Sequence, residues 1–176
     1  MFADLVARMS VLIHLAIAVG LVLLVGAALH DIAVRTVPNC VSAALAMLGL
    51  VARLLAGDLP VGLAVAVAVF AVAAVLWFLR LMGGADTKLL GAVALVAPPE
   101  RVLDVMLMTA VCGGVLALFY LAMSRVVSRP AAGRPGTLPG RLVKAEQWRL
   151  SRRGPLPYAV AIAGGSLISL SPLVAG

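Results

Sequence analysis

Charged side chains are scarce in this chain. Of its 176 residues, 12% are Asp, Glu, Lys or Arg, whereas 64% are hydrophobic and the mean hydropathy is +1.16. A soluble domain of this size exposes too much surface to be covered by so few polar side chains. The composition therefore excludes an ordinary soluble protein and indicates that lipid is the solvent for much of the chain.

Aromatic residues are also few, at 5%. A formal net charge of +7 would raise the question of nucleic acid binding in a soluble protein. Here the charges lie between long apolar runs, so the basic excess is better explained as a signal of membrane topology. We therefore expect no nucleic acid partner.

Cysteine is nearly absent, since only Cys40 and Cys112 occur. Each lies within an apolar run and they form no CxxC pair, which argues against a metal site or a disulfide framework. We expect both to be small buried or lipid-facing residues. We also expect no metal and no cofactor.

Six long apolar runs dominate what is present. Their continuous apolar character favours helices over the alternating strands of a membrane barrel. The sequence therefore predicts an all-α, polytopic membrane protein with about six transmembrane helices. The fourth run is the shortest, and we expect the first to be a retained helix because no small-residue cleavage site follows it. The runs are 9–29, 36–52, 59–79, 89–99, 105–124 and 154–176.

Basic residues alternate between the connections of these runs. Of the 14 Lys and Arg residues, all but Arg8, Arg53 and Arg101 fall in the first, third and fifth connections. The positive-inside rule places those three connections in the cytoplasm, in the cytoplasmic (inner) membrane, with both termini facing outward.

The fifth connection, at about 125–153, is the longest polar segment of a chain that we otherwise interpret as a single membrane domain, 1–176. Its first part is rich in Pro, Gly and Arg and is expected to be flexible. Residues 141–150 could form a short basic helix on the lipid surface. We expect anionic membrane lipids to be partners of this loop.

Seven acidic residues occur. Asp31 follows the first apolar run and Asp86 precedes the fourth, so both are predicted at the same face of the membrane. Ionisable groups at membrane boundaries cost free energy to desolvate and often mark function. Each also has a purely structural alternative. Asp31 could pair with Arg35 four residues on, and Asp86 could cap the fourth helix. Asp104 is expected to be an interfacial residue near Arg101.

The context of the two aspartates is specific. Asp31 precedes the turn Val37-Pro38-Asn39, and Asp86 ends the stretch Gly83-Gly84-Ala85-Asp86, which continues Thr87-Lys88-Leu89-Leu90. The first segment resembles the first aspartate motif of prepilin peptidases, and the second resembles the GxGD motif of that family of membrane aspartic peptidases. Within the family, the short size resembles the TadV/CpaA branch, which processes Flp-type (type IVb) prepilins.

The resemblance implies that Asp31 and Asp86 are catalytic. It also implies that the substrates are prepilin or pseudopilin precursors, cleaved at the cytoplasmic face just before their hydrophobic segment. Two carboxylates that share one proton can activate water and protonate the leaving amine. Which aspartate is base and which is acid stays open at this point. A contact with the pilus assembly machinery is a further possible partnership.

Two departures from the family pattern occur. Ala85 stands where bacterial members usually have Gly, although archaeal preflagellin peptidases accept a hydrophobic residue there, and we expect activity to survive. The sequence also has no paired CxxC motifs, so we expect no N-terminal domain of the kind that the larger bifunctional members carry. We therefore expect no N-methylation of the cleaved pilin.

Other residues of the two motifs have candidate roles in the active-site loop or in substrate binding. Gly83 and Gly84 are expected to allow backbone conformations closed to other residues and to let a substrate strand come close. Pro38 and Asn39 are expected to start the second helix. Lys88 could stabilise the Asp86 carboxylate, but a structural or lipid contact is favoured.

Two other functions compete with the peptidase hypothesis. A transporter or proton-relay protein would also use membrane acids, but it would place them near the bilayer midplane, which here is almost free of charge. A scaffold of pilus assembly with an inactive aspartate pair is the third possibility, and Ala85 is the one feature that suggests it.

Overall fold

The structure, a computed structural model, describes residues 2–126 and 156–175. This part of the chain is all-α, as predicted, with six α-helices and one short 3-10 helix. The remainder of the predicted basic loop, including the helix expected at 141–150, lies outside the described residues. The helices are α1 (Phe2–Val34), α2 (Asn39–Ala56), α3 (Leu59–Phe78), α4 (Gly84–Val96), η1 (Pro99–Arg101), α5 (Val102–Val126) and α7 (Tyr158–Ala175).

Four of the described segments are long and apolar enough to cross a bilayer. They are Val6–Val34, Asn39–Ala56, Leu59–Phe78 and Pro99–Val126. Their outward faces carry large apolar side chains, such as Val22, Phe78 and Leu118, which are 71%, 81% and 68% exposed. Such faces are stable in contact with lipid. The chain is therefore a multi-pass membrane protein.

Proline marks helix boundaries where the sequence predicted them. Pro38 is the N-cap of α2, and α4 ends before Pro98 and Pro99. The fourth helix begins earlier than the apolar run 89–99 indicates. Helix α4 starts at Gly84 and includes the polar residues that precede this run. Its 13 residues are still about 20 Å long, which is less than the hydrocarbon core of a bilayer.

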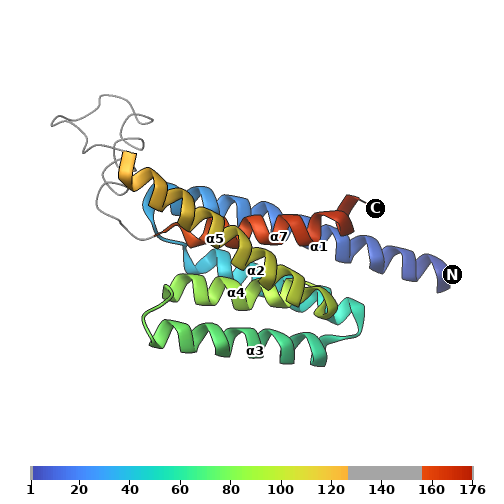
Figure 1. Ribbon diagram of the computed structural model, residues 1–176. Helices are drawn as coiled ribbons and strands as arrows, with labels where there is room; N and C mark the ends of the chain where they lie inside the picture. The colour runs from blue at the N-terminus through green and yellow to red at the C-terminus, as the bar shows by residue number, and fades with distance from the viewer. Residues whose placement is uncertain (1, 127–155, 176) are drawn as a thin grey trace.

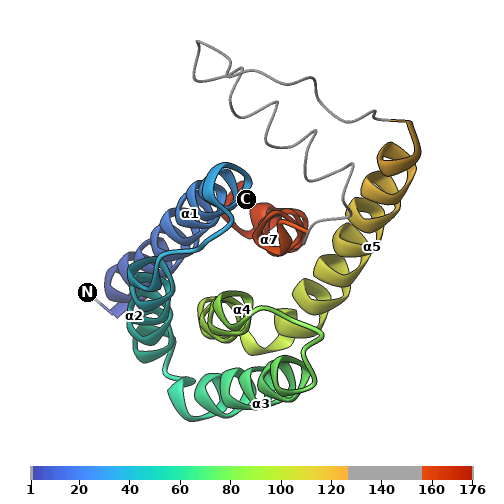
Figure 2. The same cartoon turned by 90° about the vertical axis from the view of Figure 1, so that its left-hand side faces the viewer.

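Helices α4 and α7 lie inside the bundle. Figure 2 shows α4 and α7 within an arc formed by α1, α2, α3 and α5. Helix α4 packs mainly on α2 and α3, and α7 packs mainly on α1 and α5. Nearly every side chain of α4 from Thr87 to Val96 is buried. Helix α4 can be shorter than the hydrocarbon core because protein, and not lipid, surrounds most of its length.

Glycine permits the closest of these contacts. A Cβ built on Gly49 of α2 would lie 2.7 Å from backbone atoms of Leu95 and Val96 in α4. A Cβ on Gly165 of α7 would overlap the backbone nitrogen of Thr109 in α5. Small residues allow membrane helices to approach in this way, and the contact is driven by packing rather than by the hydrophobic effect.

Both aspartates of interest lie at one end of the bundle. Helix α1 ends there with Asp31 in its last turn, and α4 begins there with Asp86 in its first turn (Figure 1). The two chain termini lie at the opposite end (Figure 1). The first, third and fifth connections therefore lie at one end of the bundle, as the alternation of basic residues predicted.

An ion pair between a buried arginine and a half-buried aspartate closes the turn between α2 and α3, at the end away from Asp31 and Asp86. Arg53 is 2% exposed, and its Nη1 donates to Oδ2 of Asp58 at 2.8 Å. Gly62 leaves room for the arginine, since a Cβ at that position would lie 2.7 Å from Cδ of Arg53. By contrast, Arg101 and Asp104, the interfacial pair expected from the sequence, form an exposed bridge at 3.5 Å.

We expect Asp58→Ala to lower the free energy of unfolding by about 3 kcal/mol, because it leaves the Arg53 guanidinium buried without its counter-charge. Asp104→Ala removes an exposed partner and should cost less than about 1 kcal/mol. Unfolding of both variants in the same detergent measures the difference. Equal losses would show that the Arg53–Asp58 pair contributes no more than a surface contact.

Candidate active site

A cavity of about 730 Å³ opens at the end of the bundle that holds the two aspartates. Asp31 and Asp86 both line it, which brings together residues 55 positions apart in the chain. The end of α1, the connection from α3 to α4 and the start of α7 supply its walls. The lining residues are Asp31, Arg35, Thr36, Val37, Leu76, Arg80, Leu81, Met82, Gly83, Gly84, Ala85, Asp86, Leu156 and Tyr158.

Asp31, in the last turn of α1, faces the start of helix α7. It is 7% exposed, and its Oδ2 accepts a hydrogen bond of 3.4 Å from the backbone N–H of Ala159, in the first turn of α7. The first N–H groups of a helix have no partner within it, and the helix dipole favours a negative charge there. The packing of α7 on α1 therefore places the N-terminus of α7 against the Asp31 carboxylate.

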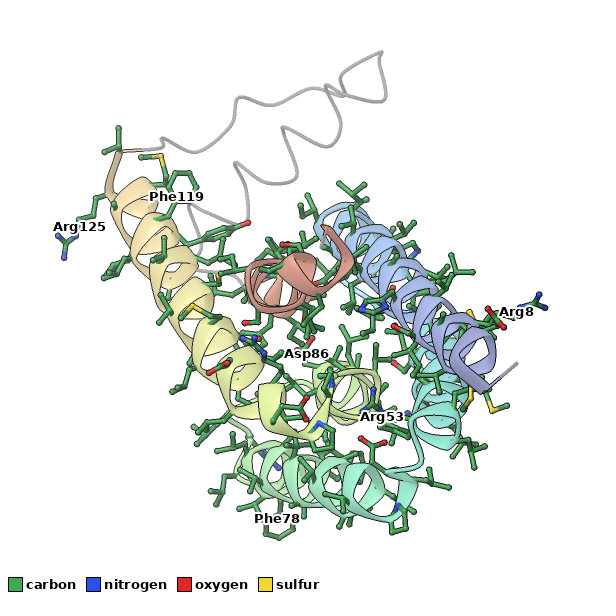
Figure 3. All side chains as sticks on the ribbon, turned by 90° about the vertical axis from the view of Figure 1, so that its right-hand side faces the viewer. Arg8, Arg53, Phe78, Asp86, Phe119 and Arg125 are labelled. Carbon is green, nitrogen blue, oxygen red and sulfur yellow. The ribbon has the colours of Figure 1, made fainter. Side chains whose placement is uncertain are left out.

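Asp86 lies inside the ring of helices, whereas Arg8, Phe78 and Arg125 project from its outside (Figure 3). It is the third residue of α4, and its carboxylate is hydrogen-bonded to the backbone of Gly83. The N-cap of α4 is Gly83, so the role of N-cap that the sequence suggested for Asp86 is wrong, and Asp86 lies on the cavity wall.

The glycines before Asp86 provide space and not an unusual backbone. Gly83 has φ −73° and ψ 144°, values that any residue adopts, so the conformational reason expected from the sequence is wrong for it. A Cβ at Gly83 would lie 2.8 Å from Oδ2 of Asp86. A Cβ at Gly84 would lie 3.2 Å from Nε1 of Trp77. Gly83 thus leaves room for the carboxylate, and Gly84 leaves room for the tryptophan.

The next two residues of the motif fix α4 to its neighbours. The Thr87 hydroxyl is close to the carbonyl of Ala73 in α3, at 3.4 Å, and to that of Gly83, at 3.1 Å. Lys88 donates to Oδ1 of Asn39 at 3.1 Å, which joins α4 to the start of α2. Lys88 and Asn39 line an apolar groove between α2, α3 and α4 instead of the cavity.

Sequence reasoning assigned no site role to several residues of the cavity. Tyr158 was not singled out, since its place at the start of the last apolar run gives no chemical signal. Arg80 was counted only as a topology signal, and Arg35 also as a possible ion-pair partner. Pro38, which was a candidate, is the N-cap of α2 and does not line the cavity, whereas Ala85 does.

Burial and the neighbouring charge act on Asp86, which lies outside the four membrane-length segments. Burial first, and the negative charge of Asp31 second, raise the pKa of Asp86 from 3.8 to about 6. The hydrogen bond with the Gly83 backbone opposes this rise. Two carboxylates in one cavity resist simultaneous ionisation, so a proton is retained by the pair at a higher pH than by an isolated carboxyl group.

Because the pKa of Asp86 is raised in the folded protein, this carboxyl group favours folding while it is protonated. That contribution to stability is lost as the pH rises from about 4 through about 6. We therefore expect Asp86→Asn to raise the melting temperature more at pH 7.5 than at pH 4.5, because the neutral amide avoids the cost of a buried charge. Thermal unfolding in detergent at the two pH values measures this. A gain that is equal at both values, or larger at pH 4.5, would contradict the prediction.

The described residues contain no group of three His, Cys, Asp or Glu side chains arranged to hold a metal ion. What the cavity offers is a pair of carboxylates, one at the start of α4 and one facing the start of α7. Such a pair is suited to proton transfer to and from water and a substrate.

Comparison with known proteins agrees with the motif resemblance. Neither a curated protein nor a solved structure matches the chain significantly. A family model described as the type IV leader peptidase family matches residues 18–118, which is more than half of the chain and includes both aspartates. The chain therefore belongs to the type IV leader peptidase family.

Proposed function

We propose that this protein is an aspartic endopeptidase of the cytoplasmic membrane that removes the short basic leader of prepilins, without N-methylation of the product. The observation that carries the proposal is the meeting of Asp31 and Asp86 in one cavity at one end of the bundle. Family membership supports the leader-peptidase activity. The concentration of basic residues at the same end supports a cytoplasmic active site.

The environments of the two carboxylates support different roles for them. Asp31 accepts an N–H from the start of α7, an arrangement that suits the role of base. Asp86 is the member whose pKa is raised. In the proposed reaction, Asp31 removes a proton from water, the resulting hydroxide attacks the scissile carbonyl carbon, and Asp86 gives its proton to the departing amide nitrogen.

The position of the cavity suits a single-span precursor. It opens at the end of the bundle and lies next to the long apolar helices, so that a peptide bond just before a membrane segment can reach it. Flp-type (type IVb) prepilins are the proposed substrates, in line with the resemblance of the sequence to the TadV/CpaA branch. Membrane lipids and the pilus assembly machinery are the further partners that we propose.

We expect Asp31→Asn and Asp86→Asn each to reduce leader cleavage at least about 1,000-fold, because one carboxylate alone cannot supply both the base and the acid. Immunoblotting of a Flp-type prepilin co-expressed with each variant would show unprocessed precursor. Asp104→Asn, which removes an exposed carboxylate elsewhere, should process normally. Normal processing by either cavity variant would exclude the aspartic mechanism.

We expect Gly83→Ala to lower kcat about 100-fold with little loss of stability. The new Cβ would displace the Asp86 carboxylate, which can rotate away at small cost, and small misplacements of catalytic groups reduce rates strongly. Gly84→Ala is the matched control, since its Cβ meets Trp77 and not the carboxylate. Equal losses of kcat in the two variants would indicate a general loop effect instead.

A further inference from the structure

The proposed hydrolysis creates a negative charge for which the two aspartates provide no partner. When hydroxide adds to the scissile carbonyl carbon, the carbonyl double bond opens and its oxygen becomes negative. The proton of Asp86 is needed by the departing nitrogen, and the proton that Asp31 has taken from water faces the attacking oxygen. The former carbonyl oxygen therefore needs a separate hydrogen-bond donor, and a donor already in place there accelerates such reactions strongly.

The cavity wall carries four side chains, other than the aspartates, with N–H or O–H donors: Arg35, Thr36, Arg80 and Tyr158. Thr36 and Arg80 are exposed and lie in connections between helices. Arg35 also lies in such a connection, and its guanidinium already donates to Tyr120. Tyr158 differs from the other three because it belongs to a helix and is partly buried.

A glycine of α5 fixes the Tyr158 ring. Helix α7 packs along α5 (Figure 2). A Cβ at Gly113 of α5 would lie 3.1 Å from Cε2 and 3.4 Å from the hydroxyl oxygen of Tyr158. The edge of the ring thus lies against α5 where that helix has no side chain. A Cβ at the neighbouring Gly114 would meet open space, so the close contact is confined to Gly113.

The first turn of α7 relates the phenol to both aspartates. Ala159 directly follows Tyr158, and its N–H donates to Oδ2 of Asp31 at 3.4 Å. The charge of Asp86 acts on the phenol from the same cavity. Within the described part of the chain the Tyr158 hydroxyl donates to no acceptor, although the hydroxyl of a buried tyrosine usually has a partner. A substrate bound at the two aspartates therefore lies beside a hydroxyl that can donate to it.

We propose that Tyr158 is a catalytic residue whose hydroxyl donates a hydrogen bond to the scissile carbonyl oxygen as this oxygen becomes negative. The inference rests on the proposed peptidase function. The phenol keeps its proton and forms no covalent bond. The charge disappears when the carbonyl double bond forms again and the C–N bond breaks. Asp86 has then given its proton to the nitrogen and Asp31 holds the proton from water, so the pair still carries one proton.

Tyr158→Phe removes the donor and keeps the ring. It should lower kcat for a leader-peptide substrate about 100-fold and leave KM within about 2-fold, because the hydrogen bond forms in the transition state and not with the bound substrate. A peptide with a hydrated difluoroketone at the scissile bond resembles the tetrahedral intermediate. Its affinity for the variant should fall about 10-fold. The measurements use the purified full-length chain in detergent.

The two adjacent glycines of α5 provide a matched pair of variants. Gly113→Ala should displace the Tyr158 ring by a few tenths of an ångström and lower kcat about 10-fold. Gly114→Ala changes the same helix without touching the ring and should retain kcat. When Tyr158→Phe is already present, Gly113→Ala should cause little further loss, since the hydroxyl that it misplaces is gone.

Three results would overturn the role of Tyr158 while the peptidase function stands. The first is a kcat of Tyr158→Phe within about 2-fold of the wild type. The second is a loss confined to KM, which would indicate a contact with the bound substrate alone. The third is a shifted pH profile with full activity at the new optimum, which would show that the phenol acts on the proton of Asp86. If the wild type cleaves no leader peptide, the peptidase proposal fails as well.

Discussion

The burial of α4 between α2 and α3 is the packing arrangement on which the site depends. Asp86 stands in the first turn of this helix, so its carboxylate is only as well placed as the helix itself. Gly49 brings α2 onto the backbone of α4 near its far end, and Thr87 contacts the carbonyl of Ala73 at the near end. A helix fixed at both ends can hold a carboxylate in a partly buried position that would otherwise relax toward water.

Helix α7 provides the second support. It begins beside Asp31, and its first turn donates a backbone N–H to that carboxylate. Gly165 allows α7 to approach α5 closely, so the position of this N–H is fixed by packing along the length of the helix. The two interior helices thus begin at the same cavity, one carrying a carboxylate and the other stabilising one. The four outer helices contain the segments that are long and apolar enough to cross a bilayer.

The charges of the cavity are balanced in an apolar chain. Two aspartates and two arginines face a space bounded mostly by small and apolar residues. Charges in such surroundings interact more strongly than at a water-exposed surface, so small differences in burial or hydrogen bonding separate the properties of chemically identical groups. The two aspartates illustrate this, since one faces a helix N-terminus and the other experiences the charge of the first.

The sequence by itself determined the class of fold, the six apolar runs and the two aspartate motifs. These depend on local composition and on short spacings, which a single chain displays directly. The tertiary structure decided which side chains meet. It showed that Gly83 is needed for space and not for its φ, that Lys88 contacts Asn39 outside the cavity, and that Arg35, Arg80 and Tyr158 line it. Contacts between residues on different helices are set by helix packing, for which hydropathy contains no information.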